Sequence, residues 1–126
     1  MDKQEKFNQA WEYKKQGNLS EALRLYKELH DELIDEAGEY ARSLPGTRVD
    51  EDSTRKIMPS LFTEAENYLK RDSVFGTILN NMGVIYADVG DIKSARKCFE
   101  ESIKFTPDGF DYPNPKIGLA ELEKQI

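Results

Sequence analysis

The 126-residue sequence has few of the residues from which catalytic sites and metal centres are usually built. It contains one cysteine, Cys98, and one histidine, His30, so an intrachain disulfide is excluded and a histidine–cysteine metal site is not expected. Cys98 directly precedes Phe99 and has no nearby base, which predicts an inert thiol. A glycine-rich phosphate-binding loop is missing, and the acidic run "DEDST" from Asp50 lacks the glycine and terminal glutamate of a calcium loop. We therefore expect no enzyme, no metal and no cofactor.

The sequence also lacks the positive charge and the long apolar runs that nucleic acids and membranes attract. Its 18 basic and 24 acidic residues give a net charge of -6, which disfavours nucleic acid and anionic membrane and favours a neutral or basic polypeptide partner. The longest weakly charged run, residues 73–87, is too short to span a bilayer. The start, "MDKQEKF", is charged where a secretory signal would be apolar, so we expect a cytoplasmic protein.

Alternating strand patterns are absent, and apolar residues recur with the period of an α-helix, so we expect an all-α fold. A first helix is expected over about residues 3–16, ending at Gly17. Asn18 followed by Glu21 is a capping-box pattern, which predicts the start of the next helix. That helix is unusually long, because its apolar positions continue without interruption: Leu19, Ala22, Tyr26, Leu29, Leu33, Ala37, Tyr40 and Leu44. Pro45-Gly46 predicts its end.

The second half of the chain repeats this alternation of helices and breaks. Residues 45–57 are polar and charged and are expected to form an exposed loop. Helix resumes near Pro59 and keeps its phase almost to Gly90, with a possible break at residues 72–73. Two shorter helices are expected over about residues 91–105 and 114–126, the first capped by Asp91 and stopped by Pro107 and the second opened by Asn114-Pro115.

Residues 3–36 and 76–109 are similar to each other. The alignment pairs Ala10 with Gly83, Tyr13 with Tyr86, Gly17 with Gly90, Leu19 with Ile92, Ala22 with Ala95, Tyr26 with Phe99 and His30 with Ile103. This helix–turn–helix self-similarity resembles the tetratricopeptide repeat, whose period is about 34 residues. The later copy also carries Leu79, Asp91 and Pro107 where the family pattern places them. The earlier copy departs from the pattern at Lys6 and Gln9, which we interpret as an amino-terminal edge of the stack.

The small residues of the two copies have a physical role in this interpretation. Antiparallel helices can approach closely only where side chains are small, so we expect Gly83 to pack against Ala95 and Ala10 against Ala22. The resemblance thus implies antiparallel helix pairs in an α-α superhelix, within a single domain of residues 1–126.

Two interpretations of the segment between the copies, residues 37–75, remain open. It is either a projecting hairpin made of lengthened central helices or a degenerate third repeat, and the continuous apolar stripes favour the hairpin. The terminal helix, residues 114–126, is expected to cap the last apolar face.

The resemblance implies a non-enzymatic adaptor or scaffold that binds a peptide segment of a partner, because the first helix of each repeat lines a concave groove in this family. The peptide-binding residues that follow from this matching are Phe7, Trp11, Lys14, Thr77, Asn80, Asn81, Val84 and Asp88. The alternative function is self-assembly into a homo-oligomer through the projecting hairpin.

Two pairs of these residues also have ordinary structural interpretations. Phe7 and Trp11 lie one turn apart and are either groove anchors or core. Asn80 and Asn81 either hydrogen-bond the partner's backbone or are solvated or bonded to a neighbouring helix. Asn81 matches an asparagine with which chaperone-binding members hold a terminal carboxylate, but the lysine and asparagine that accompany it are replaced here by Phe7 and Trp11, which argues against such a clamp.

Overall fold

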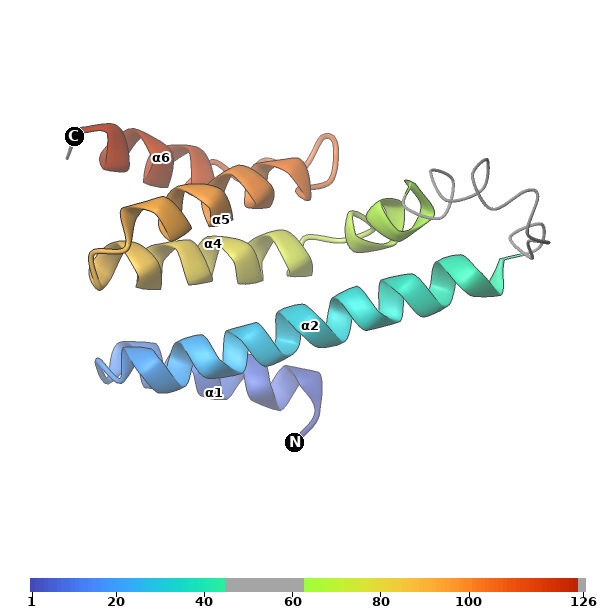
Figure 1. The fold of residues 1–126 in the computed structure, drawn as a ribbon, viewed down its shortest axis with the longest axis horizontal. Coiled ribbons are helices and arrows are strands. Elements are labelled where there is room, and N and C mark those ends of the chain that lie inside the picture. Colours follow the sequence, from blue (N-terminus) through green and yellow to red (C-terminus); the bar gives the residue numbers. More distant parts are fainter. Residues whose placement is uncertain (45–62, 125–126) are drawn as a thin grey trace.

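A computed structural model describes residues 1–44 and 63–124, and this part of the chain is helical without any strand (Figure 1). The helices are α1 (Lys3–Lys15), α2 (Leu19–Ser43), α4 (Val74–Asp88), α5 (Ile92–Lys104) and α6 (Asn114–Lys124), and residues 63–69 are also helical. The expected all-α fold is therefore confirmed. The predicted stop at Pro45-Gly46, the loop over 45–57, the helix start near Pro59 and the acidic run from Asp50 lie outside the described residues.

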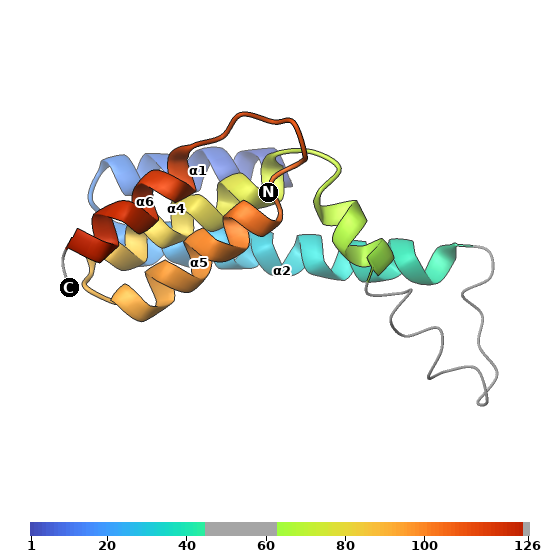
Figure 2. The same ribbon diagram turned by 90° about the horizontal axis from the view of Figure 1, so that it is seen from above.

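The helices pack as antiparallel neighbours along the chain. Helix α1 lies against α2, α4 against α5, and α6 against α5 (Figure 1). Helix α4 is central, because it also contacts α2 and α6. In the view from above, α1 and α6 lie toward one side of the molecule and α2 and α5 toward the other (Figure 2). This arrangement leaves α1, α4 and α6 to form one face.

The turns that join the two helix pairs have the same hydrogen bonds. After α1, the backbone N–H of Asn18 donates to the carbonyl of Tyr13 at 2.9 Å, and after α4 that of Asp91 donates to Tyr86 at 2.9 Å. The glycine in each turn has positive φ, 81° in the first turn and 84° in the second, which a residue with a Cβ adopts only with strain. Both bonds belong to the Schellman motif, so the two copies seen in the sequence also share their local geometry.

Side chains also cap the second helix of each pair. The N–H of Glu21 donates to Asn18 Oδ1 at 3.5 Å, and the N–H of Ser94 donates to Asp91 Oδ1 at 3.2 Å. The second hydrogen bond of the expected capping box, from the N–H of Asn18 to the carboxylate of Glu21, is not formed. The N–H of Asn18 is already bound in the turn, and the carboxylate of Glu21 binds Arg24 instead.

The four small residues singled out by the repeat are all buried, and Ala10, Ala22 and Ala95 have no exposed surface. The side chain nearest to Gly83 is that of Phe99. An added Cβ at Gly83 would have the ring of Phe99 as its nearest neighbour, at 2.7 Å, rather than Ala95. The same ring would lie 2.6 Å from a Cβ at Gly118. Phe99 on α5 is therefore held between glycines of α4 and α6.

Lys6, which departs from the family pattern, forms an ion pair between helices. Its ammonium group pairs with Glu32 and, at 3.7 Å, with Glu28, both on α2. The hydrogen bond with Glu32 is the main cause that raises the pKa of Lys6 above its usual range. A charged residue at this position thus attaches α1 to α2.

Helix α2 extends well past the length of a single repeat, to Ser43, and residues 63–69 pack beside its far end (Figure 2). The rings of Tyr40 and Tyr68 lie 5.0 Å apart, and the Tyr68 hydroxyl donates to Glu36 at 3.4 Å. The possible break at residues 72–73 is present, since α4 begins at Val74, whose N–H donates to Asp72 Oδ1 at 3.0 Å. The choice between an inserted hairpin and a degenerate repeat stays a prediction.

Candidate binding site

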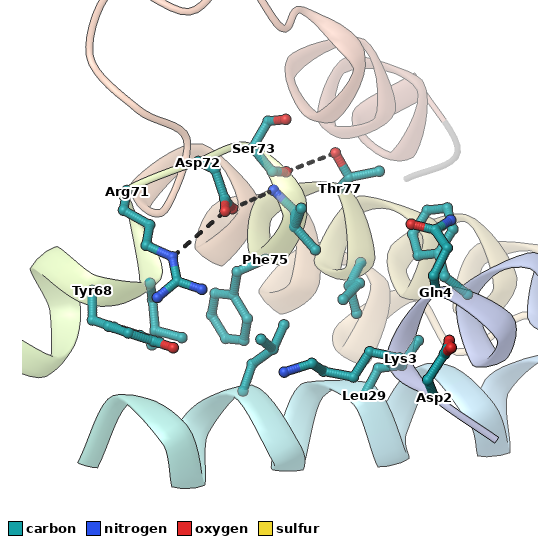
Figure 3. A pocket seen from close by; sticks show the side chains of 15 residues that line it. Asp2, Lys3, Gln4, Leu29, Tyr68, Arg71, Asp72, Ser73, Phe75 and Thr77 are labelled. Carbon is teal, nitrogen blue, oxygen red and sulfur yellow. Dashed lines mark hydrogen bonds and ion pairs between the residues drawn. The ribbon is translucent and has the colours of Figure 1, made fainter. Parts of the chain in front are cut away.

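A cavity of about 630 Å³ opens where the first turns of α1 and α4 face each other across α2 (Figure 3). Its apolar lining comes from four parts of the chain and consists of Phe7, Leu29, Leu33, Leu69, Val74, Phe75 and Ile78. Its polar lining consists of Asp2, Lys3, Gln4, Tyr68, Arg71, Asp72, Ser73 and Thr77.

The charged groups at the rim of the cavity are bound to other groups of the chain. The guanidinium of Arg71 lies 3.8 Å from the ring centre of Tyr68 and 3.6 Å from Asp72, and its contact with Tyr68 is the main cause that raises its pKa. Lys3 pairs with Glu36, and Asp2 Oδ1 accepts the N–H of Glu5 at 2.8 Å. With these charges neutralised locally, the cavity is suited to an uncharged, apolar group.

The two aromatic residues predicted on α1 have different environments. Phe7 lines the cavity and packs edge-on against Tyr26, with ring centres 5.9 Å apart. It is therefore part of the core as well as of the cavity wall. Trp11 is 43 % exposed, and Lys14 lies over its ring at 5.1 Å from the centre. Trp11 and Lys14 thus form one exposed pair on α1.

The predicted residues of α4 range from exposed to buried. Asp88 is exposed, and Val84 is half-buried against the cluster around Phe99. Thr77 lines the cavity, and its hydroxyl donates to the carbonyl of Ser73 at 2.8 Å. Among the residues predicted to bind peptide, the structure brings only Phe7 and Thr77 together in this cavity.

Asn80 and Asn81 are both buried, at 5 % and 8 % exposure. Asn81 Nδ2 donates to the hydroxyl of Tyr26 at 3.3 Å and so links α4 to α2. Burial raises the pKa of the Tyr112 hydroxyl above its usual value. The side chains of Thr77 and Asn80, with which this hydroxyl interacts, have a smaller and opposite effect. Asn81 is therefore engaged within the fold, as in the structural interpretation of this pair.

The cavity residues that sequence reasoning missed include five buried apolar side chains, Leu29, Leu33, Leu69, Phe75 and Ile78. Their spacing marks them as the buried stripe of a helix, and no sequence pattern separates a stripe that is covered from one that borders a cavity. The break between helices at residues 71–73 was the sequence feature that could have indicated the cavity, because such a break leaves space beside the start of α4.

The remaining titratable candidates lie in structural environments. His30 stacks on Phe75 with ring centres 5.2 Å apart, and burial raises the pKa of the Cys98 thiol to about 11. Among residues 1–44 and 63–124, no three His, Cys, Asp or Glu side chains are grouped to hold a metal ion. None of the described helices combines the length and apolar character needed to cross a bilayer.

The antiparallel α4–α5 pair, with its glycine turn and small residues at the helix contacts, defines a protein built from helix–turn–helix repeats. The family model of the tetratricopeptide repeat matches residues 76–108, which identifies this segment as a tetratricopeptide repeat. Comparisons with curated proteins and with solved structures give no match. A tetratricopeptide repeat indicates a general role in protein–protein interaction, and such proteins are typically scaffolds without enzymatic activity. The first copy, residues 3–36, lies outside the matched segment and is supported by its equivalent turn.

Proposed function

We propose that this protein is an adaptor that binds a peptide segment of a partner on the face formed by α1, α4 and α6. The observation that carries the proposal is the cavity of about 630 Å³ between the first turns of α1 and α4, which has an apolar lining and a locally neutralised rim. Its volume falls in the range of about 300–1,000 Å³ that is typical of ligand sites. In this proposal an apolar side chain of the partner binds in the cavity.

One buried side chain is not sufficient for a stable complex. Burial of a Leu or Phe side chain contributes about 1.5–3 kcal/mol, whereas micromolar affinity corresponds to about 8 kcal/mol. Trp11 is the natural second anchor, because tryptophan is enriched among residues that dominate binding and its ring is 43 % exposed. The partner segment would therefore extend from the cavity along α1 to Trp11.

Charge favours a basic partner over an acidic one. The net charge of the chain is -6, and Asp88 is exposed near the end of α4. These acidic groups would speed association with a basic segment more than they would increase its affinity. We expect Lys14, Val84 and Asp88 to contribute contacts at the periphery of the site.

Capture of partners from native lysate tests this proposal when it is done with two matched variants. Val74 borders the cavity and is 46 % exposed, whereas Ile34 lies on α2 away from the cavity and is 43 % exposed. We expect Val74→Asp to lose the captured partner at least tenfold and Ile34→Asp to retain it. Equal retention by both folded variants would refute the assignment of the cavity. A Trp11→Ala variant tests the second anchor. It leaves the core intact, whereas Phe7→Ala would disturb it.

Self-assembly remains the second candidate because α2 carries two exposed apolar residues, Ile34 and Tyr40, at 43 % and 41 % exposure. Sedimentation analysis of the unmodified protein tests it. A monomer at all concentrations would remove this function, whereas a dimer that Ile34→Asp dissociates and Val74→Asp does not would support it.

A further inference from the structure

The first two turns of α5 carry basic side chains that the fold does not use. Most lysine and arginine side chains within residues 1–44 and 63–124 form an ion pair or lie over an aromatic ring. In this part of the chain, those without such a partner are Lys93, Arg96, Lys97 and Lys116. Three of them lie close together on α5, although the net charge of the chain is -6. We call Lys93, Arg96 and Lys97 the basic end of α5.

The basic end of α5 has an electrostatic cost for the fold. Asp91 caps this helix, but Lys93 is its second residue, where the positive end of the helix dipole disfavours a cation. The first turns of α1 and α2 each contain a glutamate instead. Glu100 and Glu101 follow about one turn later, in the less favourable order for helical ion pairs, and neither is paired with the basic end. Charges that oppose the stability of their own fold are typical of functional sites.

Lys93 and Lys97 lie one turn apart on the outer side of α5, and both are exposed. The buried residues of this helix lie on its opposite side and are Ala95, Cys98, Phe99 and Ser102. Arg96 is half-buried beside the two lysines. Lys27 of α2 adds a cation nearby: burial, the largest effect, raises the pKa of the Cys98 thiol, and Lys97 and Lys27 both oppose that rise.

This basic surface is separate from the cavity. Helices α2 and α5 lie on the side of the molecule away from α1 and α6 (Figure 2). None of the four cations is among the residues that line the cavity. A partner bound to α5 therefore leaves the cavity free.

We propose that the basic end of α5 binds an acidic segment of a partner protein, whose aspartate or glutamate side chains pair with Lys93, Arg96 and Lys97. Lys93 and Lys97 are separated by about 6 Å along the helix axis, and alternate residues of an extended chain by about 6.6 Å. An extended segment with acidic residues at alternate positions therefore matches the two lysines. This second interaction surface does not depend on the peptide site at the cavity.

The net charge of the molecule restricts the partner to a short acidic segment. At physiological ionic strength charges act over about 8 Å, so a short segment on α5 responds mainly to the basic end itself. A nucleic acid or an anionic membrane would extend past α5 and meet the acidic remainder of a chain with net charge -6. A peptide is therefore favoured over these larger polyanions.

Titration of the ¹⁵N-labelled protein with hexaglutamate at low salt tests this proposal. We expect the amide resonances of Lys93, Arg96 and Lys97 to shift, and the shifts to decrease as salt is added. The double variant Lys93→Gln/Lys97→Gln should bind hexaglutamate about fivefold more weakly, the effect of losing two exposed ion pairs. The control Lys116→Gln/Lys124→Gln removes the same two charges from exposed positions on α6 and should retain the affinity.

Melting temperatures separate a loss of binding from a loss of folding. Lys93→Gln removes a cation from the first turn of α5, so we expect a melting temperature equal to or above that of the unmodified protein. A lower melting temperature would overturn the proposal, because Lys93 would then have a structural role.

Four results of the titration would also overturn the proposal. They are the absence of any shift at low salt, an equal loss of affinity in both double variants, tighter binding of hexathymidylate through the same residues, and shifts of these amides with protein concentration alone. The last result would assign the surface to a second copy of the chain.

Discussion

Replacement of Gly83 by alanine adds one methyl group at the point where three helices meet. The new Cβ would lie 2.7, 2.8 and 3.0 Å from three ring atoms of Phe99, which is closer than real Cβ contacts. The ring cannot move away freely, because the backbone of Gly118 on α6 also lies close to it: a Cβ built on Gly118 would be 2.6 Å from the same ring. Phe99 is 2 % exposed, so no route to solvent is open to it.

The size of the effect follows from two opposing terms. Overpacking of a core costs about 1–3 kcal/mol, and replacement of a helical glycine by alanine regains about 1 kcal/mol of helix propensity. Because the ring is held from both sides, we expect the upper part of this range and a net loss of about 1–2 kcal/mol in the free energy of unfolding.

Gly38→Ala is the matched control, since Gly38 also lies inside a helix. The atoms nearest to its new Cβ are those of the Arg42 guanidinium, at 3.2 Å, the far end of a flexible side chain that need shift by only a few tenths of an ångström. We expect Gly38→Ala to increase the free energy of unfolding by about 0.5–1 kcal/mol. Urea unfolding followed by circular dichroism measures both variants. If Gly83→Ala were stabilising to the same degree as Gly38→Ala, the reasoning about the ring would be wrong.

Three further predictions concern buried polar and ionisable groups. Ser102→Ala removes the bond of 2.6 Å from its buried hydroxyl to the carbonyl of Gly76 and should cost about 1–3 kcal/mol in urea unfolding; an unchanged midpoint would contradict this. Tyr26→Phe leaves the amide of Asn81 without its acceptor and should cost about 1–3 kcal/mol, with hydrogen exchange of α4 increased; unaltered exchange would contradict it. The pKa of Cys98 is raised from 9.0 to about 11, so the folded state holds this proton more tightly than the unfolded state. Its contribution to stability is complete below about pH 9 and is lost as the pH rises toward 11, and the difference between unmodified protein and Cys98→Ala across that interval measures it.

The helices and turns were predictable from the sequence because their causes are local. A glycine at the end of α1 and of α4, followed by Asn18 or Asp91, specifies both the turn and the next helix cap. The burial of Ala10, Ala22, Gly83 and Ala95 was also predictable, since the repeat places small residues together at the helix contacts.

The contacts between residues of different helices were less predictable from the sequence than the helices and turns themselves. The sequence suggests that Gly83 packs against Ala95, whereas the atoms nearest to a Cβ at Gly83 belong to the ring of Phe99, one turn further along α5. Similarly, nothing in the local pattern around Asn81 indicates Tyr26, which lies 55 residues away in the sequence. Contacts of this kind depend on how α2, α4 and α6 are oriented, and that orientation follows from packing of the whole core.

The most direct test of the account is a photo-cross-linking measurement at the cavity. A benzoylphenylalanine in place of Val74 lies at the cavity rim, and one in place of Ile34 lies at a similarly exposed position on α2. After irradiation in native lysate, we expect the residue at position 74 to give a dominant adduct that mass spectrometry maps to one short segment of a partner protein, and the residue at position 34 to give none. Equal adducts from both positions, or no adduct at position 74 while the same partner is still retained, would contradict the assignment of this cavity as the binding site.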